Sequence, residues 1–196
     1  MTTSQDRAEL LRLAEVAKAI PGHFAEAGVR RAESFIPIAR VAKAAGKLCF
    51  GFDSFEGMTV HTKRDVLPNG ECRWPMGKLH TGGEAGHQAV IRACETAGLA
   101  STTRVTRGWV PQCLEAVSAE RFAFVHLDLD QYAPTLAAAR FFWPLLSPGG
   151  IIICHDVWPG DAYQASGGFH DFAAEIGQTI TCLDAIPYGW IQKAAK

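Results

Sequence analysis

Apolar residues follow two different periods along the chain. Short apolar runs, typical of buried strands, alternate with longer segments in which apolar residues recur every three or four positions, as on one side of a helix. The helical period predicts helices at 1–20, 34–45, 84–97, 112–120, 132–146 and 169–176. The apolar runs predict strands at 23–29, 47–53, 102–110, 122–130 and 151–158, followed by two closing strands within 179–193. Strands that alternate with helices indicate an α/β fold with helices on both faces of a sheet.

One long segment breaks this alternation. Residues 54–83 contain seven glycines and prolines and show neither period. Connections of this length inside a compact domain are uncommon and are often functional. We therefore expect residues 58–83 to form a substrate loop or lid, with a surface insertion of no special role as the alternative.

Composition narrows the class of protein. The 196 residues are 48% hydrophobic and 20% charged, which fits a single globular domain over 1–196. The net charge of −1 gives no reason to expect nucleic acid or an anionic membrane as a partner. None of the six cysteines forms a C-x-x-C pair, which favours reduced thiols. No secretory leader and no apolar run of membrane-spanning length are visible, so a cytoplasmic location is expected.

Polar side chains interrupt the strand expected at 122–130. His126, Asp128 and Asp130 occupy alternate positions, which places them on one face of a strand. Polar groups in such a row are costly to bury without partners. We expect Asp128 and Asp130 to face a crevice beyond the sheet, and His126 to be a hydrogen-bonded structural histidine deeper in the strand.

The other expected strands also end in polar residues. Open parallel sheets bind ligands beyond the carboxyl ends of their strands. In chain order the strand ends carry Glu26 and Gly28, Asp53 and Ser54, Gly108 and Trp109, Asp128 and Asp130, and His155 and Asp156. A carboxylate stands at four of the five ends, which a core does not require, so this edge is the predicted binding site. Taken alone, Glu26 could form a surface ion pair, and Asp53 could cap the turn that follows it.

The residues around Asp53 suggest a kind of ligand. An acidic side chain at the end of the second strand is suited to hydrogen-bond a ribose diol. The turn after the first strand, AEAGVRRAES, has one glycine where the pyrophosphate-binding pattern G-x-G-x-x-G has three. A nucleoside ligand without phosphates, such as S-adenosylmethionine, therefore fits better than a dinucleotide.

A second group of residues predicts a metal. Two carboxylates and an imidazole from adjacent strand ends can hold a divalent cation such as Mg²⁺ or Mn²⁺, and the expected ligands are Asp128, His155 and Asp156. A hydrogen-bonded cluster in which His155 balances the acids is the alternative. Asp130 lies two residues beyond Asp128 and is available as a general base.

Five stretches in this order resemble the macrocin O-methyltransferase-like family of S-adenosylmethionine-dependent methyltransferases: FAEAGV, FGFDSFEG, TRGWV, HLDLDQYAPTLAA and FFWPLLSPGGIIICHD. The match runs from about Pro21 to the C-terminus. It implies a Rossmann-like, doubly wound, mostly parallel sheet of seven strands with an antiparallel last strand. It also implies methyl transfer to a hydroxyl of a small-molecule acceptor, such as a sugar or natural product, and self-association into a homo-oligomer.

The resemblance also implies a role for each residue at the binding edge. For the cofactor it implies Glu26 and Gly28 near the methionine, Asp53 and Ser54 at the ribose, and Gly108 and Trp109 near the adenine. It further implies Asp128, His155 and Asp156 as metal ligands, and Asp130 as the base that deprotonates the acceptor. Asp128 is expected to serve catalysis and cofactor binding as well as the metal.

Two places depart from the family pattern. Ala32 and Glu33 stand where glycines are usual, and His155 stands where an acid is usual. An imidazole supplies no negative charge and so weakens a magnesium site. These departures leave two alternatives open: a metal-independent methyltransferase for another nucleophile such as an amine, and a non-catalytic binding protein that keeps the fold.

Overall fold

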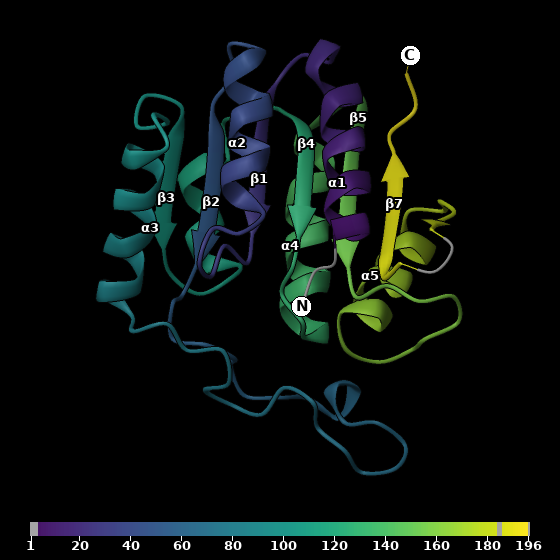
Figure 1. The fold of residues 1–196 in the computed structure, drawn as a ribbon. Helices are drawn as coiled ribbons and strands as arrows, with labels where there is room; N and C mark the ends of the chain where they lie inside the picture. Colours follow the sequence, from purple (N-terminus) through teal and green to yellow (C-terminus); the bar gives the residue numbers. More distant parts are fainter. Residues whose placement is uncertain (1–3, 184–185, 196) are drawn as a thin grey trace.

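The computed structural model describes residues 4–183 and 186–195. Seven strands form one sheet in the order β3-β2-β1-β4-β5-β7-β6. Strands β1 to β5 are parallel, and β7 runs antiparallel to both of its neighbours (Figure 1). The predicted doubly wound, mostly parallel sheet with an antiparallel last strand is confirmed. Residues 184 and 185, inside the segment predicted to hold the closing strands, lie outside the described residues.

The elements have the following bounds. The strands are β1 (His23–Ala27), β2 (Cys49–Asp53), β3 (Thr103–Arg107), β4 (Phe122–Leu127), β5 (Leu146–His155), β6 (Thr181–Cys182) and β7 (Tyr188–Gln192). The α-helices are α1 (Ser4–Val16), α2 (Phe35–Ala44), α3 (Glu84–Thr96), α4 (Tyr132–Leu145) and α5 (Gln164–Glu175). Three short 3-10 helices are η1 (Ala17–Ala19), η2 (Lys63–Asp65) and η3 (Gln112–Val117). No helix among these residues is both long and apolar enough to cross a membrane.

Each face of the sheet is covered by helices because neighbouring strand residues point in opposite directions. Phe124 of β4 belongs to an apolar cluster with Leu13 of α1 and Phe35 of α2. The next residue, Val125, belongs to the cluster on the other face with Phe142 of α4. The two clusters bury both faces of the central strands.

The strand predicted at 122–130 ends earlier than expected. Strand β4 stops at Leu127, and Asp130 has a backbone φ of 59°, outside the extended region. Of the three residues predicted to share one strand face, only His126 lies within the strand. Asp128 and Asp130 lie in the turn that follows, which corrects that part of the prediction.

Glycine-rich stretches account for two further differences. Residues 147–150 separate a predicted helix from a predicted strand but are part of β5, where the register with β4 jumps from Leu146 to Ile151 and Gly149 has a φ of +81°. Helix α5 begins at Gln164 rather than at 169, and its early part includes Gly167 and Gly168, of which Gly168 allows α5 to approach α4 closely. A Cβ atom at Gly168 would lie 2.5 Å from the Tyr132 carbonyl oxygen. The predicted helix at 112–120 is the 3-10 helix η3.

Residues 58–83, here called the strap, extend past the carboxyl ends of the parallel strands (Figure 1). Backbone hydrogen bonds join the two ends of the strap: the Met58 N–H donates to the Lys78 carbonyl at 2.9 Å, and the Gly77 N–H donates to the Met58 carbonyl at 2.9 Å. The strap therefore has a fixed stem and lies at the edge where the sequence predicts the binding site.

Candidate active site

A buried pair of polar side chains joins the two central strands. Glu26 of β1 and His126 of β4 are direct neighbours in the register, and His126 Nδ1 lies 2.8 Å from Glu26 Oε1. The Ser34 hydroxyl donates to the same oxygen at 2.5 Å. Burial raises the pKa of Glu26, although both partners oppose the rise. The other oxygen, Oε2, is buried without a hydrogen-bond partner in the described part of the chain and can accept a hydrogen bond from a ligand.

The turn after β1 is built by Gly28. Its φ is +98°, and a Cβ atom there would lie 1.8 Å from the Asp128 carbonyl oxygen. The ends of β1 and β4 can therefore approach each other only with glycine at this position. This close approach brings the turn of β1 next to Asp128.

Asp53 lies at the end of β2 and binds the same turn. Its Oδ2 accepts a hydrogen bond from the Arg30 N–H at 2.7 Å, and its Oδ1 accepts one from the Phe55 N–H at 2.6 Å. Burial raises the pKa of Asp53 despite these two donors. Each carboxylate oxygen has a second lone pair, so Asp53 can still accept hydrogen bonds from a pair of hydroxyls.

Ala32 and Glu33 are the departures from the family pattern in the turn after β1. Ala32 adopts a φ of 62°, the left-handed conformation that favours glycine. This conformation costs an L-residue about 1–2 kcal/mol. Burial of the alanine methyl, whose residue is 2% exposed, offsets part of that cost. Glu33 is exposed, so its charge is solvated.

Gly108 and Trp109 lie at the end of β3, next to Asp53. The Gly108 N–H donates to the Asp53 carbonyl at 2.9 Å. Trp109 is 44% exposed and presents apolar surface at the same edge of the sheet. Ser54 has a local role, because its hydroxyl accepts a hydrogen bond from the Glu56 N–H at 3.1 Å.

His155, the last residue of β5, lies between two carboxylates. Its Nδ1 is 3.3 Å from Asp128 Oδ1 and 3.3 Å from Asp156 Oδ1. Neither ring nitrogen makes a hydrogen bond of normal geometry to another described residue, so the pairing is electrostatic. Burial disfavours the charged ring, but the two facing carboxylates outweigh burial and raise the pKa of His155 to about 11. In this arrangement His155 lies at the centre of the charges of Asp128 and Asp156.

Asp130 is the fourth member of this cluster and differs from its neighbours. It is 9% exposed. Burial and the carboxylates of Asp128 and Asp156 raise the pKa of Asp130 well above its usual range. Burial would also raise the pKa of Asp128, but His155 outweighs burial there and lowers it. Two carboxyls whose pKa values are pushed apart are a common basis for acid–base roles.

The charge on His155 predicts a dependence of stability on pH. The folded pKa is about 11, whereas an unfolded histidine titrates near 6.5. The stabilising contribution is therefore complete below about pH 6.5 and is lost progressively as the pH rises toward the folded value. The free energy of unfolding should fall between pH 6.5 and 8.5 more steeply in the wild type than in His155→Gln, as measured by urea titration. Parallel pH slopes for the two proteins would contradict the ion pair.

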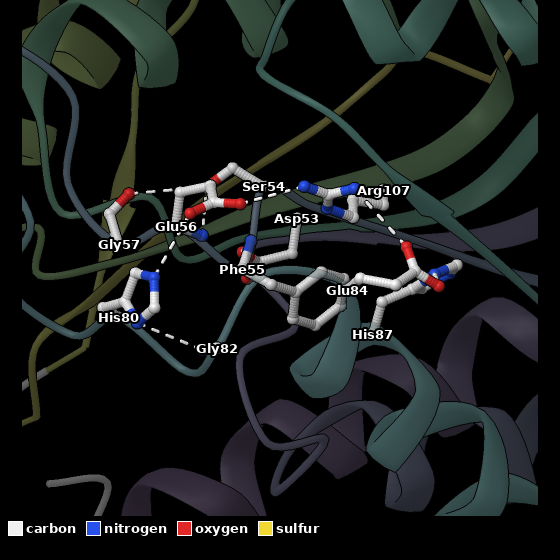
Figure 2. Close-up of polar contacts among 10 residues, drawn as sticks. All are labelled: Asp53, Ser54, Phe55, Glu56, Gly57, His80, Gly82, Glu84, His87 and Arg107. Atoms are coloured by element: carbon white, nitrogen blue, oxygen red, sulfur yellow. Dashed lines mark hydrogen bonds and ion pairs between the residues drawn. The ribbon is translucent and has the colours of Figure 1, made fainter.

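An exposed group of charges fixes the strap to the end of β3 (Figure 2). Glu56 lies between two partners, with Oε1 2.9 Å from Arg107 Nη2 and Oε2 3.2 Å from His80 Nε2. Arg107 also lies 3.4 Å from Glu84. Sequence reasoning missed Glu56 and Arg107 as contributors to the site. Glu56 could have been found from its position in the FGFDSFEG stretch, three residues after the predicted Asp53.

The structure brings the predicted strand-end residues to one edge of the sheet. Among residues 4–183 and 186–195, no group of three or more His, Cys, Asp or Glu side chains is placed to hold a metal ion.

Residues of the strap that contact the turn around Asp130, above all Asp65, were also missed. The strap has no periodic pattern from which such contacts could have been predicted.

The comparisons with known proteins agree with this fold. The family described as methyltransferase domain matches residues 25–157, and the chain belongs to that family. The chain is 31% identical over 187 residues to 8-demethyl-8-(2,3-dimethoxy-α-L-rhamnosyl)-tetracenomycin-C 4'-O-methyltransferase of Streptomyces olivaceus. That match covers 92% of this chain and 69% of the relative. The protein is an S-adenosylmethionine-dependent methyltransferase, as the sequence predicted.

Solved structures share the fold at lower identity. The O-methyltransferase NovP matches with a TM-score of 0.74 and 19% identity, over 96% of this chain and 79% of that one. The calicheamicin methyltransferase CalS11 matches with a TM-score of 0.71 and 20% identity, over 97% of this chain and 80% of that one. At these identities the likeness concerns the fold.

Proposed function

We propose that the protein transfers the methyl group of S-adenosylmethionine to a hydroxyl of a sugar or glycosylated natural product. The observation that carries the proposal is Asp130, a buried carboxyl beyond β4 beside the Asp128–His155–Asp156 cluster. A carboxyl there is suited to take the proton of an acceptor hydroxyl. A sugar hydroxyl is supported by the Streptomyces relative, whose name states 4'-O-methyl transfer.

The residues of β1, β2 and β3 fit the cofactor. The unpartnered Oε2 of Glu26 suits the methionine ammonium group. The second lone pairs of Asp53 suit the two ribose hydroxyls, and the exposed face of Trp109 suits the adenine. S-adenosylmethionine supplies an electrophilic methyl group on a sulfonium, whose carbon–sulfur bond breaks as the acceptor oxygen bonds to carbon. The chain itself orients the acceptor and removes its proton.

The residues at the predicted metal site do not fit a cation. A metal ligand must direct a free lone pair at the ion, whereas His155 Nδ1 lies 3.3 Å from a carboxylate oxygen on either side. Nδ1 faces two carboxylates, so it carries a proton and has no lone pair to give, and Nε2 is buried. We therefore assign no step to a metal. In this proposal His155 provides the positive charge between Asp128 and Asp156, and metal assistance stays a prediction of the sequence.

Calorimetric titration of S-adenosylmethionine, followed by methyl transfer with and without EDTA, tests the proposal. The acceptors are a rhamnosylated natural product and an amino-sugar analogue of it, and products are identified by mass spectrometry. We expect micromolar cofactor binding, a methyl ether as product, and equal rates in EDTA and in magnesium.

Each contrary result supports a different alternative. Turnover that EDTA abolishes and magnesium restores would establish metal assistance. A methylamine product would establish an amine acceptor, and no cofactor binding would leave a non-catalytic protein. Self-association and a cytoplasmic location also stay predictions, the first of which light scattering on the same sample checks.

A further inference from the structure

The backbone around Asp130 is strained. The Gln131 N–H donates to the Leu129 carbonyl at 2.6 Å, which closes a three-residue turn centred on Asp130, and the φ of Asp130 is 59°. Turns of this kind with a positive central φ are rare and strained. Such a conformation persists only where the surrounding contacts over-determine it. The contacts that hold this turn are therefore of interest for the function of Asp130.

The strap makes the first of these contacts through Gln131. The Thr59 N–H donates to Gln131 Oε1 at 3.1 Å, and Gln131 Nε2 donates to the Thr59 carbonyl at 3.1 Å. Gln131 is 2% exposed, so both hydrogen bonds are shielded from water. The residue directly after Asp130 is thereby tied to the strap at two points.

The strap makes the second contact through Asp65, which is 1% exposed. Asp65 Oδ1 accepts a hydrogen bond from the Tyr132 N–H, at the start of α4, at 2.7 Å. Its Oδ2 accepts hydrogen bonds from the Thr62 N–H at 2.7 Å and the Thr62 hydroxyl at 2.8 Å. A carboxylate at a helix N-terminus is also favoured by the helix dipole. Asp65 thus fixes the second residue after Asp130.

We propose that Asp65 and Gln131 are positioning residues that hold Asp130 in its working conformation, so that methyl transfer depends on docking of the strap. The inference rests on the proposed role of Asp130 as the base. When these contacts are absent, the strained turn relaxes and the carboxyl moves away from the acceptor hydroxyl. A displacement of about 1 Å in a catalytic group can lower the rate about 10²-fold.

Three variants separate positioning from folding. Asp65→Ala removes the acceptor of the Tyr132 N–H. Asp65→Asn keeps an oxygen that can accept this hydrogen bond, and so should restore most of the activity. Asn69→Ala is the matched control, because the exposed Asn69 side chain also accepts a backbone N–H within the strap, that of Glu71, without contacting α4.

The first readout is kinetic. We expect Asp65→Ala to lower kcat about 10- to 100-fold with little change in the KM for S-adenosylmethionine, because the base is misplaced while the cofactor site is intact. In an Asp130→Asn background the same substitution should lower kcat hardly any further, because the base that Asp65 positions is absent. An equal loss in both backgrounds would overturn the inference, as would equal losses in Asp65→Ala and Asn69→Ala.

The second readout does not need activity and so separates this inference from the proposed function. Amide hydrogen exchange should show faster exchange at Gln131 and Tyr132 in Asp65→Ala, with strand β4 still protected, and no such change in Asn69→Ala. Unchanged protection of Gln131 and Tyr132 would overturn the inference even if the enzyme is active. Faster exchange in a protein with no transferase activity would instead mean that the coupling holds and that the proposed function fails.

Discussion

Replacing Asp130 with asparagine is expected to lower kcat about 10²- to 10⁴-fold, the usual contribution of a general base. Asparagine keeps the size and the hydrogen-bonding oxygen of the side chain but cannot take a proton. Binding of S-adenosylmethionine should persist, because Glu26 and Asp53 lie in other strands. Steady-state kinetics and calorimetry on the same preparation measure both quantities.

The pH profile gives a second check on Asp130. Its pKa is raised by burial and by Asp128 and Asp156, and a base acts only when deprotonated. The wild-type rate should therefore rise with pH through this raised pKa, and Asp130→Asn should lose that rise. Glu115→Gln, which removes an exposed carboxylate elsewhere, should retain it. A wild-type level of kcat in Asp130→Asn would exclude Asp130 as the base.

Gly28→Ala is expected to have the largest effect on folding. A Cβ atom at Gly28 would lie 1.8 Å from the Asp128 carbonyl oxygen, and the φ of +98° is itself unfavourable for alanine. Backbone strain and overpacking together should cost about 2–6 kcal/mol of unfolding free energy. Cofactor binding should weaken as well, because the ends of β1 and β4 must separate. Urea unfolding and calorimetry measure the two effects.

Gly98→Ala is the matched control for this substitution. Gly98 also has a positive φ, +70°, but a Cβ atom there would meet nothing within 4 Å. Gly98→Ala should lower the free energy of unfolding by about 1–2 kcal/mol, the cost of the backbone conformation alone. If Gly28→Ala costs no more than Gly98→Ala, the close approach of β1 to β4 is not needed for the fold.

The sequence allowed the sheet and the polar edge to be predicted because both follow from simple regularities. Apolar runs mark strands, and the carboxyl ends of parallel strands meet at one edge, so Glu26, Asp53 and Asp128 could be assigned to the same edge from their order alone. The early end of β4 was not predictable in this way. At this point Gly28 approaches a backbone carbonyl and Asp130 has a positive φ, and the pattern of apolar residues indicates neither feature.

The partners within the site were less predictable than its members. Glu26 pairs with His126 because the register of β1 and β4 sets them side by side, and a sequence does not give register across non-consecutive strands. His155 was expected among metal ligands, whereas its ring lies between two acids in an ion-paired arrangement. The contacts of Asp65 depend on how an aperiodic segment docks. Local sequence rules do not describe such docking.

The strap is held at its stem by Met58 and Lys78, by the contacts of Thr59 and Asp65, and by His80. Residues 66–76 lie between Asp65 and the second half of the stem. The hydrogen bonds found within this outer part stay inside the strap, as between the Leu67 N–H and the Glu71 carbonyl at 2.9 Å. Substitutions, insertions or deletions there can thus accumulate without moving Asp130. The outer part is consequently a natural site for evolutionary divergence in acceptor choice, and for grafting a foreign segment when the enzyme is redesigned.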